Sequence, residues 1–179
     1  DGKLSRGLGD VYKRQALNLA SLWDLPVLFL CENNQYGMSM ASDKAVAGES
    51  IASRGNSYGI ESIQIDGNDV EAVFESVTSF KNEILASNRP KFIEAVTYRY
   101  RGHSKSDRNL YRTSDEIEYW KEEKDPIKRY IGKLIESGVT EAKLKEIDEG
   151  VKELIRDSVK KALDSPMSPV TNLEEDSYA

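Results

Sequence analysis

Apolar positions recur at helical spacing in three early segments, and a short apolar run follows each of them. We predict helices over residues 16–23, 47–58 and 70–87 and strands over residues 27–31, 60–65 and 91–98. The first run, VLFLC, is wholly apolar, which is typical of a strand buried on both faces in the centre of a parallel sheet. Because helices and strands alternate as in right-handed βαβ crossovers, we expect an α/β fold with a doubly wound, mostly parallel sheet.

The last third of the chain has helical patterning only. Thr113 and Asp125-Pro126 are typical helix starts, and we predict helices over residues 114–121, 126–137 and 141–163. The longest of these helices has one apolar stripe and Lys/Glu-rich faces, which most often face solvent. We expect a single domain, with an α/β portion at residues 16–112 and a helical extension at residues 113–165. An acidic tail, residues 166–179, follows.

Composition and charge narrow the class of protein. The chain has 179 residues, of which 39% are hydrophobic, enough for one core. The net charge of −6 argues against nucleic acid as a partner. No apolar run approaches the roughly 18–20 residues that span a bilayer, so we expect no membrane segment. A single cysteine, Cys31, and a single histidine, His103, exclude a disulfide framework and an ordinary Cys/His zinc site. With no signal-peptide pattern, these features predict a cytoplasmic protein.

Residues 1–15 differ from the rest of the chain. They carry four Lys/Arg against two Asp, contain three glycines and show almost no periodicity. We interpret them as an atypical arm. The arm is either a segment that is not native to the following domain or an ordinary frayed N-terminus.

Two polar segments follow predicted strands, where ligands bind in open parallel sheets. The first loop, residues 32–42, contains ENNQYG, whose amide and carbonyl oxygens suit Mg²⁺ or Ca²⁺. The second loop, residues 99–112, contains RYRGHSKSD, whose cations and hydroxyls suit a phosphate. The alternatives are an Asn-rich turn that satisfies its own backbone and a solvated basic loop.

The two loops together resemble a known family. ENNQYGMSM after VLFLC, and TYRYRGHSKSD followed by YRTSDEIEYW and KDPI, closely resemble the alpha subunit of thiamine diphosphate-dependent 2-oxo acid and acetoin dehydrogenases. The resemblance implies decarboxylation of a 2-oxo acid such as pyruvate, or acetoin cleavage, with acyl transfer to a lipoyl group. It implies thiamine diphosphate and Mg²⁺ as cofactors, and the partially represented thiamine diphosphate-binding fold. It also implies a beta subunit, in an alpha2beta2 heterotetramer, and a lipoyl-bearing acyltransferase core as partners.

The resemblance also implies roles for single residues. Asn34 matches the side-chain ligand of Mg²⁺, and Tyr36 matches the residue that offers its backbone carbonyl to the metal. Arg99 and His103 match residues at the cofactor diphosphate, and His103 also lies near the reacting carbon, which makes it the catalytic candidate. Ser104 is a further cofactor-site candidate, at a position that is phosphorylated in some family members.

One part of the family pattern is not reproduced. The family motif begins with Gly-Asp-Gly, whose aspartate is a metal ligand, and at the family spacing this position falls near Ser5. Asp10 is too close to Asn34, and Gln15 stands where a glutamate is expected. We therefore expect a fragment, corresponding to roughly the C-terminal half of such a subunit and joined to an unrelated leader. We also expect that the isolated chain does not bind the cofactor measurably.

Parts of the sequence are also compatible with two other classes of function. A serine hydrolase would use Ser39 with Asp66 and His103, which follow the chain order of α/β-hydrolases. That class requires the serine on a sharp turn from a strand into a helix, whereas no helical pattern follows Ser39 closely. The other alternative is a non-catalytic assembly module whose helical third pairs with other subunits.

Overall fold

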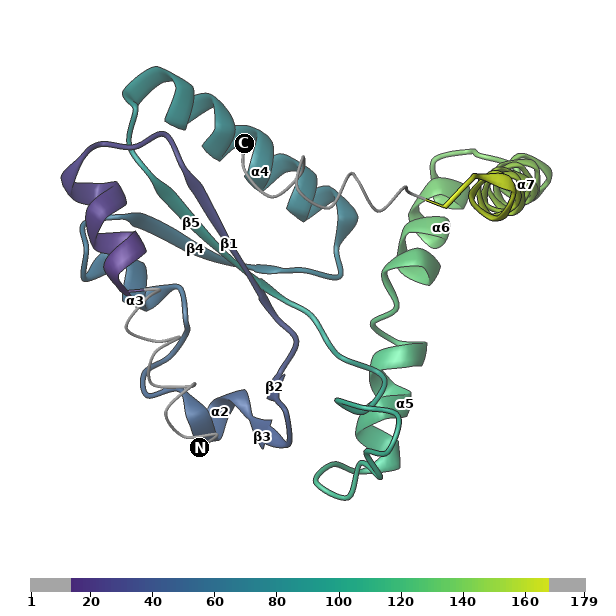
Figure 1. Cartoon of the computed structure of the whole chain (residues 1–179), viewed down its shortest axis with the longest axis horizontal. Coiled ribbons are helices and arrows are strands. Elements are labelled where there is room, and N and C mark those ends of the chain that lie inside the picture. The colour runs from purple at the N-terminus through teal and green to yellow at the C-terminus, as the bar shows by residue number, and fades with distance from the viewer. Residues whose placement is uncertain (1–13, 168–179) are drawn as a thin grey trace. The chain divides into compact units, whose positions relative to one another are not determined.

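A computed structural model describes residues 14–167 (Figure 1). Helix covers residues 14–22. The following elements are β1 (Leu28–Asn33), β2 (Tyr36–Gly37), β3 (Met40–Ala41), α2 (Ser42–Ala45), α3 (Ser53–Asn56), β4 (Glu61–Asp66), α4 (Val70–Ser87), β5 (Lys91–Val96), α5 (Ser114–Glu122), α6 (Pro126–Glu136) and α7 (Glu141–Asp164). The chain forms two compact units, Asp1–Tyr130 and Ile131–Ala179, so their boundary falls within α6. Most of the predicted arm and of the predicted tail lies outside the described residues.

Three parallel strands form the main sheet, in the order β1-β5-β4. In the register, Asn33 and Asp66 both pair with Val96, so all three strands end at one edge. The predicted α/β class with a parallel sheet is therefore confirmed. The predicted central position of the first apolar strand is wrong, because β5 lies in the centre and Leu30 of β1 is half exposed.

The two faces of the sheet are covered by different helices. On one face lies α3, where a Cβ on Gly55 would come within 2.1 Å of Ser62 Oγ and 3.5 Å of Phe92 Cβ. The opposite face carries α4, because Lys91, the neighbour of Phe92 in the strand, binds Glu83 of α4. Successive strand residues point to opposite faces, so the sheet is wound on both sides.

The main core lies under α3 and the opening helix. Its buried members are Leu17, Ala52, Ile60 and Phe92, with Phe29, Cys31, Ile51 and Tyr58 packed around them. On the α4 side, Phe80, Ile84 and the fully buried Ile93 fill the space between helix and sheet. Apolar burial on both faces of β5 is the main source of stability for this unit.

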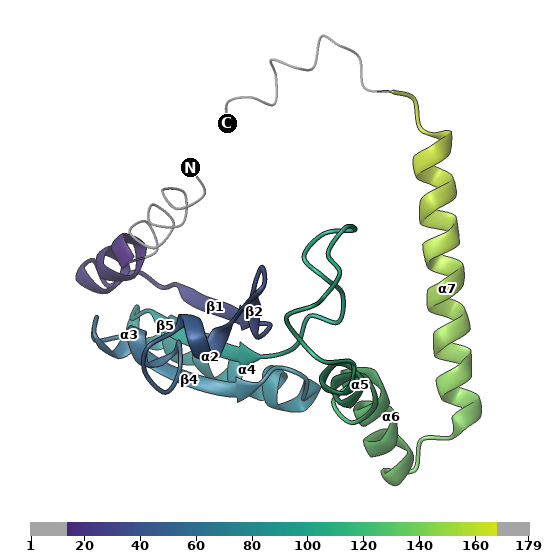
Figure 2. The same cartoon turned by 90° about the horizontal axis from the view of Figure 1, so that it is seen from below.

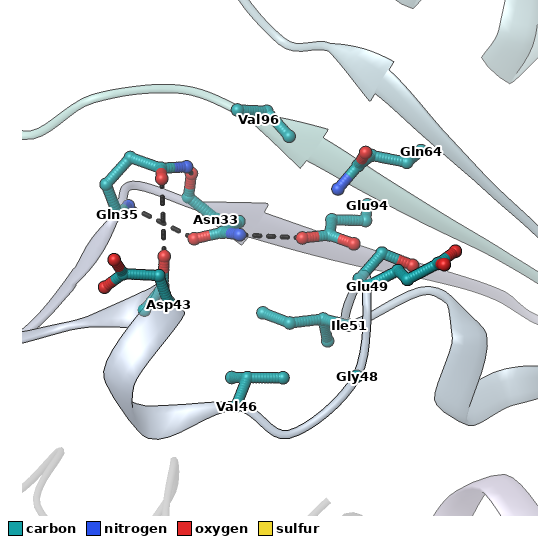
Figure 3. Close-up of a pocket in the computed structure, with 12 residues that line it drawn as sticks. Asn33, Gln35, Asp43, Val46, Gly48, Glu49, Ile51, Gln64, Glu94 and Val96 are labelled. Carbon is teal, nitrogen blue, oxygen red and sulfur yellow. Dashed lines mark hydrogen bonds between the residues drawn. The ribbon is translucent and has the colours of Figure 1, made fainter.

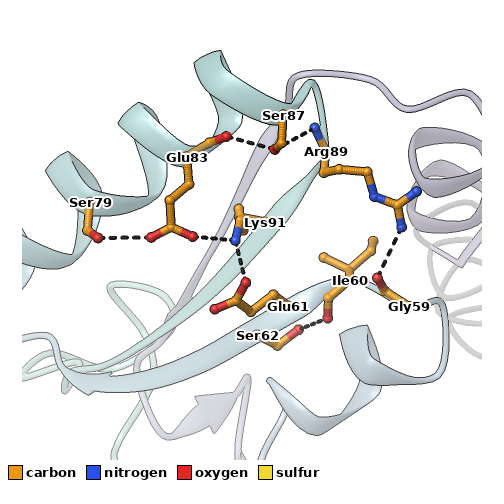
Figure 4. A network of polar contacts seen from close by, with 9 residues as sticks. All are labelled: Gly59, Ile60, Glu61, Ser62, Ser79, Glu83, Ser87, Arg89 and Lys91. Atoms are coloured by element: carbon orange, nitrogen blue, oxygen red, sulfur yellow. Dashed lines mark hydrogen bonds and ion pairs between the residues drawn. The ribbon is translucent and has the colours of Figure 1, made fainter.

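A buried lysine ties α4 to the sheet (Figure 4). Lys91 Nζ binds the carboxylates of Glu61, on the neighbouring strand β4, and Glu83, on α4. The ammonium group also lies 5.0 Å from the centre of the Phe80 ring. Burial acts to lower the pKa of Lys91, but the hydrogen bonds to the two carboxylates outweigh it and the net shift is upward.

The predicted helix over residues 47–58 is wrong. Within that range only the short helix α3 (Ser53–Asn56) forms, because α2 ends before it, at Ala45. Gly48 has φ +102°, outside the helical region, and Ser50 Oγ accepts a hydrogen bond from the Ser53 amide at 3.1 Å. The Ala52 amide donates to Glu94 instead of to a helical carbonyl. Side chains and a glycine turn therefore replace the helical bonds that the apolar spacing predicted.

The remaining predicted helices are confirmed to within a residue or two. The Asp69 side chain accepts from the Glu71 and Ala72 amides at the start of α4, and Asn88, with φ 53°, ends that helix. In the second unit, α7 is one continuous helix (Figure 2). None of the residues of α7 is buried. Among the described residues, no helix is both long and apolar enough to cross a bilayer.

Candidate functional site

The first and second loops begin side by side. Because β1 and β5 are parallel neighbours and end in register, the chain leaves both strands at the same edge. The Thr97 amide donates to the Asn33 carbonyl at 2.9 Å, and the Arg99 amide donates to the Asn34 carbonyl at 3.3 Å. The pairing of the two strands thus continues into the loops and holds them together.

Two local turns shape the first loop. Asn33 Oδ1 accepts from the Gln35 amide at 3.1 Å, and Asn34 Oδ1 accepts from the Tyr36 amide at 3.2 Å. Gln35 takes the left-handed conformation, with φ 70°. The Asn-rich turn therefore does satisfy its own backbone. An amide oxygen has two lone pairs, so Asn34 Oδ1 keeps one acceptor position for a cation.

Arg99 joins the two loops through its side chain. Its Nη1 donates to the Tyr36 carbonyl at 3.4 Å, and its Nη2 donates to the Met38 carbonyl and to the Tyr111 hydroxyl. The structure therefore brings together three of the predicted site residues: Asn34, Tyr36 and Arg99. A guanidinium beside carbonyl and amide oxygens suits a ligand that carries both phosphate oxygens and a divalent cation.

Asp107 organises the backbone around His103. Its carboxylate accepts from the His103 amide at 2.7 Å, the Asn109 amide at 2.9 Å and the Tyr111 hydroxyl at 2.8 Å. These bonds, first the one from Asn109, lower the pKa of Asp107 to about 2. Gly102 is required at this turn, because a Cβ there would lie 2.6 Å from Asp107 Cβ.

His103 and Ser104 are exposed farther along the second loop. The Ser104 hydroxyl lies 3.0 Å from the Ser106 hydroxyl. Within the part of the chain that the structure describes, no hydrogen bond joins either residue to the first loop. The predicted site residues thus form one connected group, containing Arg99, and one exposed group on the same loop.

The residues of the two loops fit the diphosphate of the implied cofactor better than they fit its Mg²⁺. The second loop carries five Lys/Arg against one Asp on a chain of net charge −6, a charge pattern that suits a diphosphate. For Mg²⁺, Asn34 and Tyr36 supply two neutral oxygens. Residues 14–167 contain no group of three or more His, Cys, Asp and Glu side chains that could hold a metal ion. These residues fit a diphosphate and part of a magnesium shell.

A buried glutamate binds the start of the first loop from the neighbouring strand (Figure 3). Glu94 of β5 is fully buried, and its two carboxylate oxygens accept from Asn33 Nδ2 at 2.7 Å and from the Ala52 amide at 2.9 Å. A polar cavity of about 280 Å³ opens beside it, with Gln35 and Gln64 in its lining. Glu94 was not among the predicted site residues, although a lone charge inside an apolar strand signals a buried polar contact.

Two further residues that support the site were also not predicted from the sequence. Arg112 is buried against the tyrosines of both loops, and Glu116 accepts hydrogen bonds from the Tyr36 and Tyr98 hydroxyls at 2.7 and 2.9 Å. The YRT segment that contains Arg112 contributed to the resemblance but had no assigned role. Its burial depends on tyrosines distant in the chain, which residue types alone do not reveal.

The hydrolase alternative is not supported. Gly37 and Met40 pair as antiparallel neighbours, so Ser39 lies in the tight turn of the β2–β3 hairpin. The nucleophile of an α/β-hydrolase requires a turn from a strand into a helix, which this hairpin does not form.

The chain that forms this parallel sheet and these two loops matches a known class of protein. Residues 2–171 match the family described as "Dehydrogenase E1 component", and the chain belongs to that family. The resemblance inferred from the two loops is therefore confirmed. The chain is 38% identical to the pyruvate dehydrogenase E1 component subunit alpha of Rhizobium meliloti, over 94% of this chain and 48% of the relative.

Two further relatives carry the same description. Over 99% of the chain and 53% of the relative, identity to the subunit alpha of Rickettsia felis is 35%. Identity to the mitochondrial type I subunit alpha of Ascaris suum is 42%, over 92% of the chain and 41% of the relative. The chain spans about half the length of the curated relatives it matches.

Proposed function

We propose that this chain forms part of the alpha subunit of a thiamine diphosphate-dependent pyruvate dehydrogenase. In this proposal it acts with a beta subunit, in an alpha2beta2 assembly in the cytoplasm, and passes an acyl group to a lipoyl-bearing acyltransferase. Membership of the E1 family and the names of the relatives support the proposal. Because those names specify pyruvate, we favour pyruvate over acetoin and branched-chain 2-oxo acids.

The junction of the two loops is the observation that carries the proposal. Arg99 contacts the carbonyl of Tyr36, the group proposed to bind Mg²⁺ together with Asn34 Oδ1. A magnesium diphosphate would thus meet a cation for its phosphate oxygens and neutral oxygens for its metal within one small region. Neither loop supplies both kinds of partner alone.

We assign the remaining roles within the second loop. Arg99 and Ser104 would bind the diphosphate, and the exposed His103 would bind it and hold or release a proton beside the reacting carbon. Thiamine diphosphate, when bound, supplies the carbon chemistry, and the protein supplies position and charge. Phosphorylation of Ser104 would add roughly −1.5 to −2 charge beside this site and oppose diphosphate binding. Leu110 stands at the family's second phosphorylation position, where it cannot be modified in that way.

Calorimetry tests the proposal. In the titrated chain a segment with Gly-Asp-Gly at the family spacing replaces residues 1–15, which restores a carboxylate for Mg²⁺. Thiamine diphosphate with Mg²⁺ is titrated into this chain mixed with the beta subunit of a pyruvate dehydrogenase. We expect saturable binding that Arg99→Met weakens tenfold or more, because a charge-assisted contact contributes about 1.5–3 kcal/mol. Arg108→Met, at an exposed cation of the same loop, is the matched control and should change affinity little.

Two results would count against the proposal. Equal affinity for both variants would remove Arg99 from the diphosphate site. Association with the beta subunit without any cofactor binding would favour the assembly-module alternative.

A further inference from the structure

Arg112 is a buried cation enclosed by tyrosines. It is 9% exposed, and its Cζ lies 5.4, 5.3 and 5.7 Å from the ring centres of Tyr36, Tyr98 and Tyr111. These rings come from the first loop, the exit of β5 and the end of the second loop. Each distance is within the range of cation–π attraction. One side chain therefore packs against three separate segments around Arg99.

Hydrogen bonds fix the orientation of the Arg112 guanidinium among the rings. Nη1 of Arg112 donates to the Arg99 carbonyl, and Nη2 donates to the Tyr100 carbonyl and to Asn109 Oδ1, both at 3.0 Å. The guanidinium thus binds the chain just after β5, at Arg99 and Tyr100, and also binds Asn109 near the end of the second loop. Because Arg99 is fixed through its own backbone, its side chain starts from a defined point beside the first loop.

Tyr36 is held on its ring and on its hydroxyl. Its ring lies 6.1 Å from that of Tyr98 and 5.4 Å from that of Tyr111. Its hydroxyl donates to Glu116 Oε1, which also accepts from the Tyr98 hydroxyl. Fixing the Tyr36 side chain restricts its backbone carbonyl.

One feature of the Arg112 side chain lowers the stability of the folded chain. Among the described residues, Arg112 Nε is the one buried side-chain nitrogen or oxygen without a hydrogen-bond partner. Leaving a buried donor unsatisfied costs about 1–3 kcal/mol. A buried donor that lowers stability at the junction of two loops indicates that Arg112 has a function besides core packing.

We propose that Arg112 is a positioning residue that sets the Tyr36 carbonyl and the Arg99 guanidinium in one arrangement. It acts through the tyrosine rings and the carbonyls at the exit of β5. The inference rests on the proposed function, in which these two groups face Mg²⁺ and the diphosphate. Arg112 would then affect cofactor affinity through the geometry of the two loops.

Hydrogen exchange of the full chain tests the positioning directly. Arg112→Met keeps an extended apolar side chain and removes every donor. We expect amides in residues 34–41 and 97–112 to exchange at least tenfold faster in this variant, with α4 unchanged. Arg112→Lys keeps the charge over the rings but not the planar set of donors, so it should restore part of the protection.

Arg129→Met is the matched control. Arg129 is also partly buried, and it binds Asp66 at 2.9 Å and Asp69 at 3.4 Å instead of either loop. This variant should leave both loop segments as protected as in the wild type. Acceleration spread evenly over β4 and α4 in Arg112→Met, or no change in residues 34–41, would overturn the proposal. If Arg112→Met does not fold, the comparison of Arg112→Lys with wild type decides by the same criteria.

Calorimetry separates this proposal from the proposed function. In the same mixture of the chain carrying the Gly-Asp-Gly segment with a beta subunit, we expect Arg112→Met to weaken binding of thiamine diphosphate with Mg²⁺ at least tenfold, with partial recovery in Arg112→Lys. Wild-type binding that is unaffected by Arg112→Met would overturn the positioning role alone. Absence of wild-type binding would overturn the proposed function, whereas the exchange experiment would still test how Arg112 holds the two loops.

Discussion

The backbone of the second loop is bent around the Asp107 carboxylate. Two amides and one hydroxyl donate to it, so its charged form is bound more tightly than its protonated form. The site therefore contains an acid–base group whose role is to fix the loop. His103 is held through its amide by this group, which leaves the imidazole exposed.

Replacing Asp107 should remove a specific pH dependence. The pKa of Asp107 is lowered to about 2 from its usual 3.8, so its contribution to stability is complete above pH 3.8 and is lost as the pH falls through 2. We expect wild type to be more stable than Asp107→Asn at neutral pH, with the difference disappearing between these values. Thermal unfolding at a series of pH values measures it.

Asp115→Asn is the control for Asp107, because Asp115 is exposed at the start of α5. It should leave the acid dependence in place. In NMR spectra, the His103 and Asn109 amides should titrate near pH 2 in wild type and in Asp115→Asn. Titration that persists in Asp107→Asn would mean that another group controls the loop.

His103→Ala should affect turnover far more than stability. The alanine retains the backbone amide that donates to Asp107, and the imidazole is exposed, so the fold loses little. Loss of one charge-assisted contact to the diphosphate costs about 1.5–3 kcal/mol, roughly a tenfold to hundredfold fall in turnover. Turnover of the assembled enzyme and the melting temperature are compared. Unchanged turnover would make His103 part of a solvated loop only.

At the residue scale, the place of the candidate residues was predictable, and the side chains that support them were not. Asn34, Tyr36 and Arg99 directly follow predicted strands, and the structure brings them together at one edge of the sheet. Arg112 and Glu94 act through partners distant in the chain, and a single sequence does not show which buried contacts will satisfy their charges.

At the scale of elements, we expect the buried Lys91 to contribute to stability by joining α4 to the sheet. Its side chain is 8% exposed, whereas those of Glu61 and Glu83 are 60% and 43% exposed. In Lys91→Met the two carboxylates can return to water, so we expect a loss near the lower end of the roughly 1.5–3 kcal/mol typical of charged hydrogen bonds. Urea unfolding followed by circular dichroism measures it.

Lys128→Met provides the comparison for Lys91. Lys128 binds Glu122 with both side chains about half exposed, and solvent-exposed pairs of this kind contribute little to stability. We expect little loss of stability in this variant. Equal losses for the two lysines would show that burial of Lys91 adds nothing to its ion pairs.

Helices with strong caps were predictable, and the placement of β1 was not. Asp69 and Thr113 cap their helices as their residue types predict. The apolar run of β1 predicted a central strand, but strand order depends on which partners pair with it, and β5 takes the centre. Between β1 and β4, Gly48 and the bond from Ala52 to Glu94 redirect a backbone whose apolar spacing was helical.

At the scale of the whole molecule, replacing residues 1–15 tests the proposed Mg²⁺ site. Asn34 and Tyr36, the proposed Mg²⁺ ligands, are neutral, and Mg²⁺ normally binds at least one carboxylate beside substrate phosphates. We expect no measurable binding of thiamine diphosphate with Mg²⁺ by the chain alone. Replacing residues 1–15 by a segment with Gly-Asp-Gly at the family spacing should increase the affinity, and calorimetry compares the two chains.

Two results would change this interpretation. Tight binding by the unaltered chain would mean that Asp1 or Asp10 reaches the metal. A replacement segment carrying Gly-Asn-Gly is the control, and if it improved affinity as much, the carboxylate would not be the cause.

The parallel pairing of β1 with β5 also sets an order of events during synthesis. Tyr36 and Arg99 are 63 residues apart in the chain, so the ribosome needs roughly 3–13 s to add the second after the first, at about 5–20 residues per second. During that interval the apolar β1 strand has left the ribosome without its partner. A nascent chain stalled before β5 should therefore bind chaperones through residues 27–31 and release them once β5 emerges.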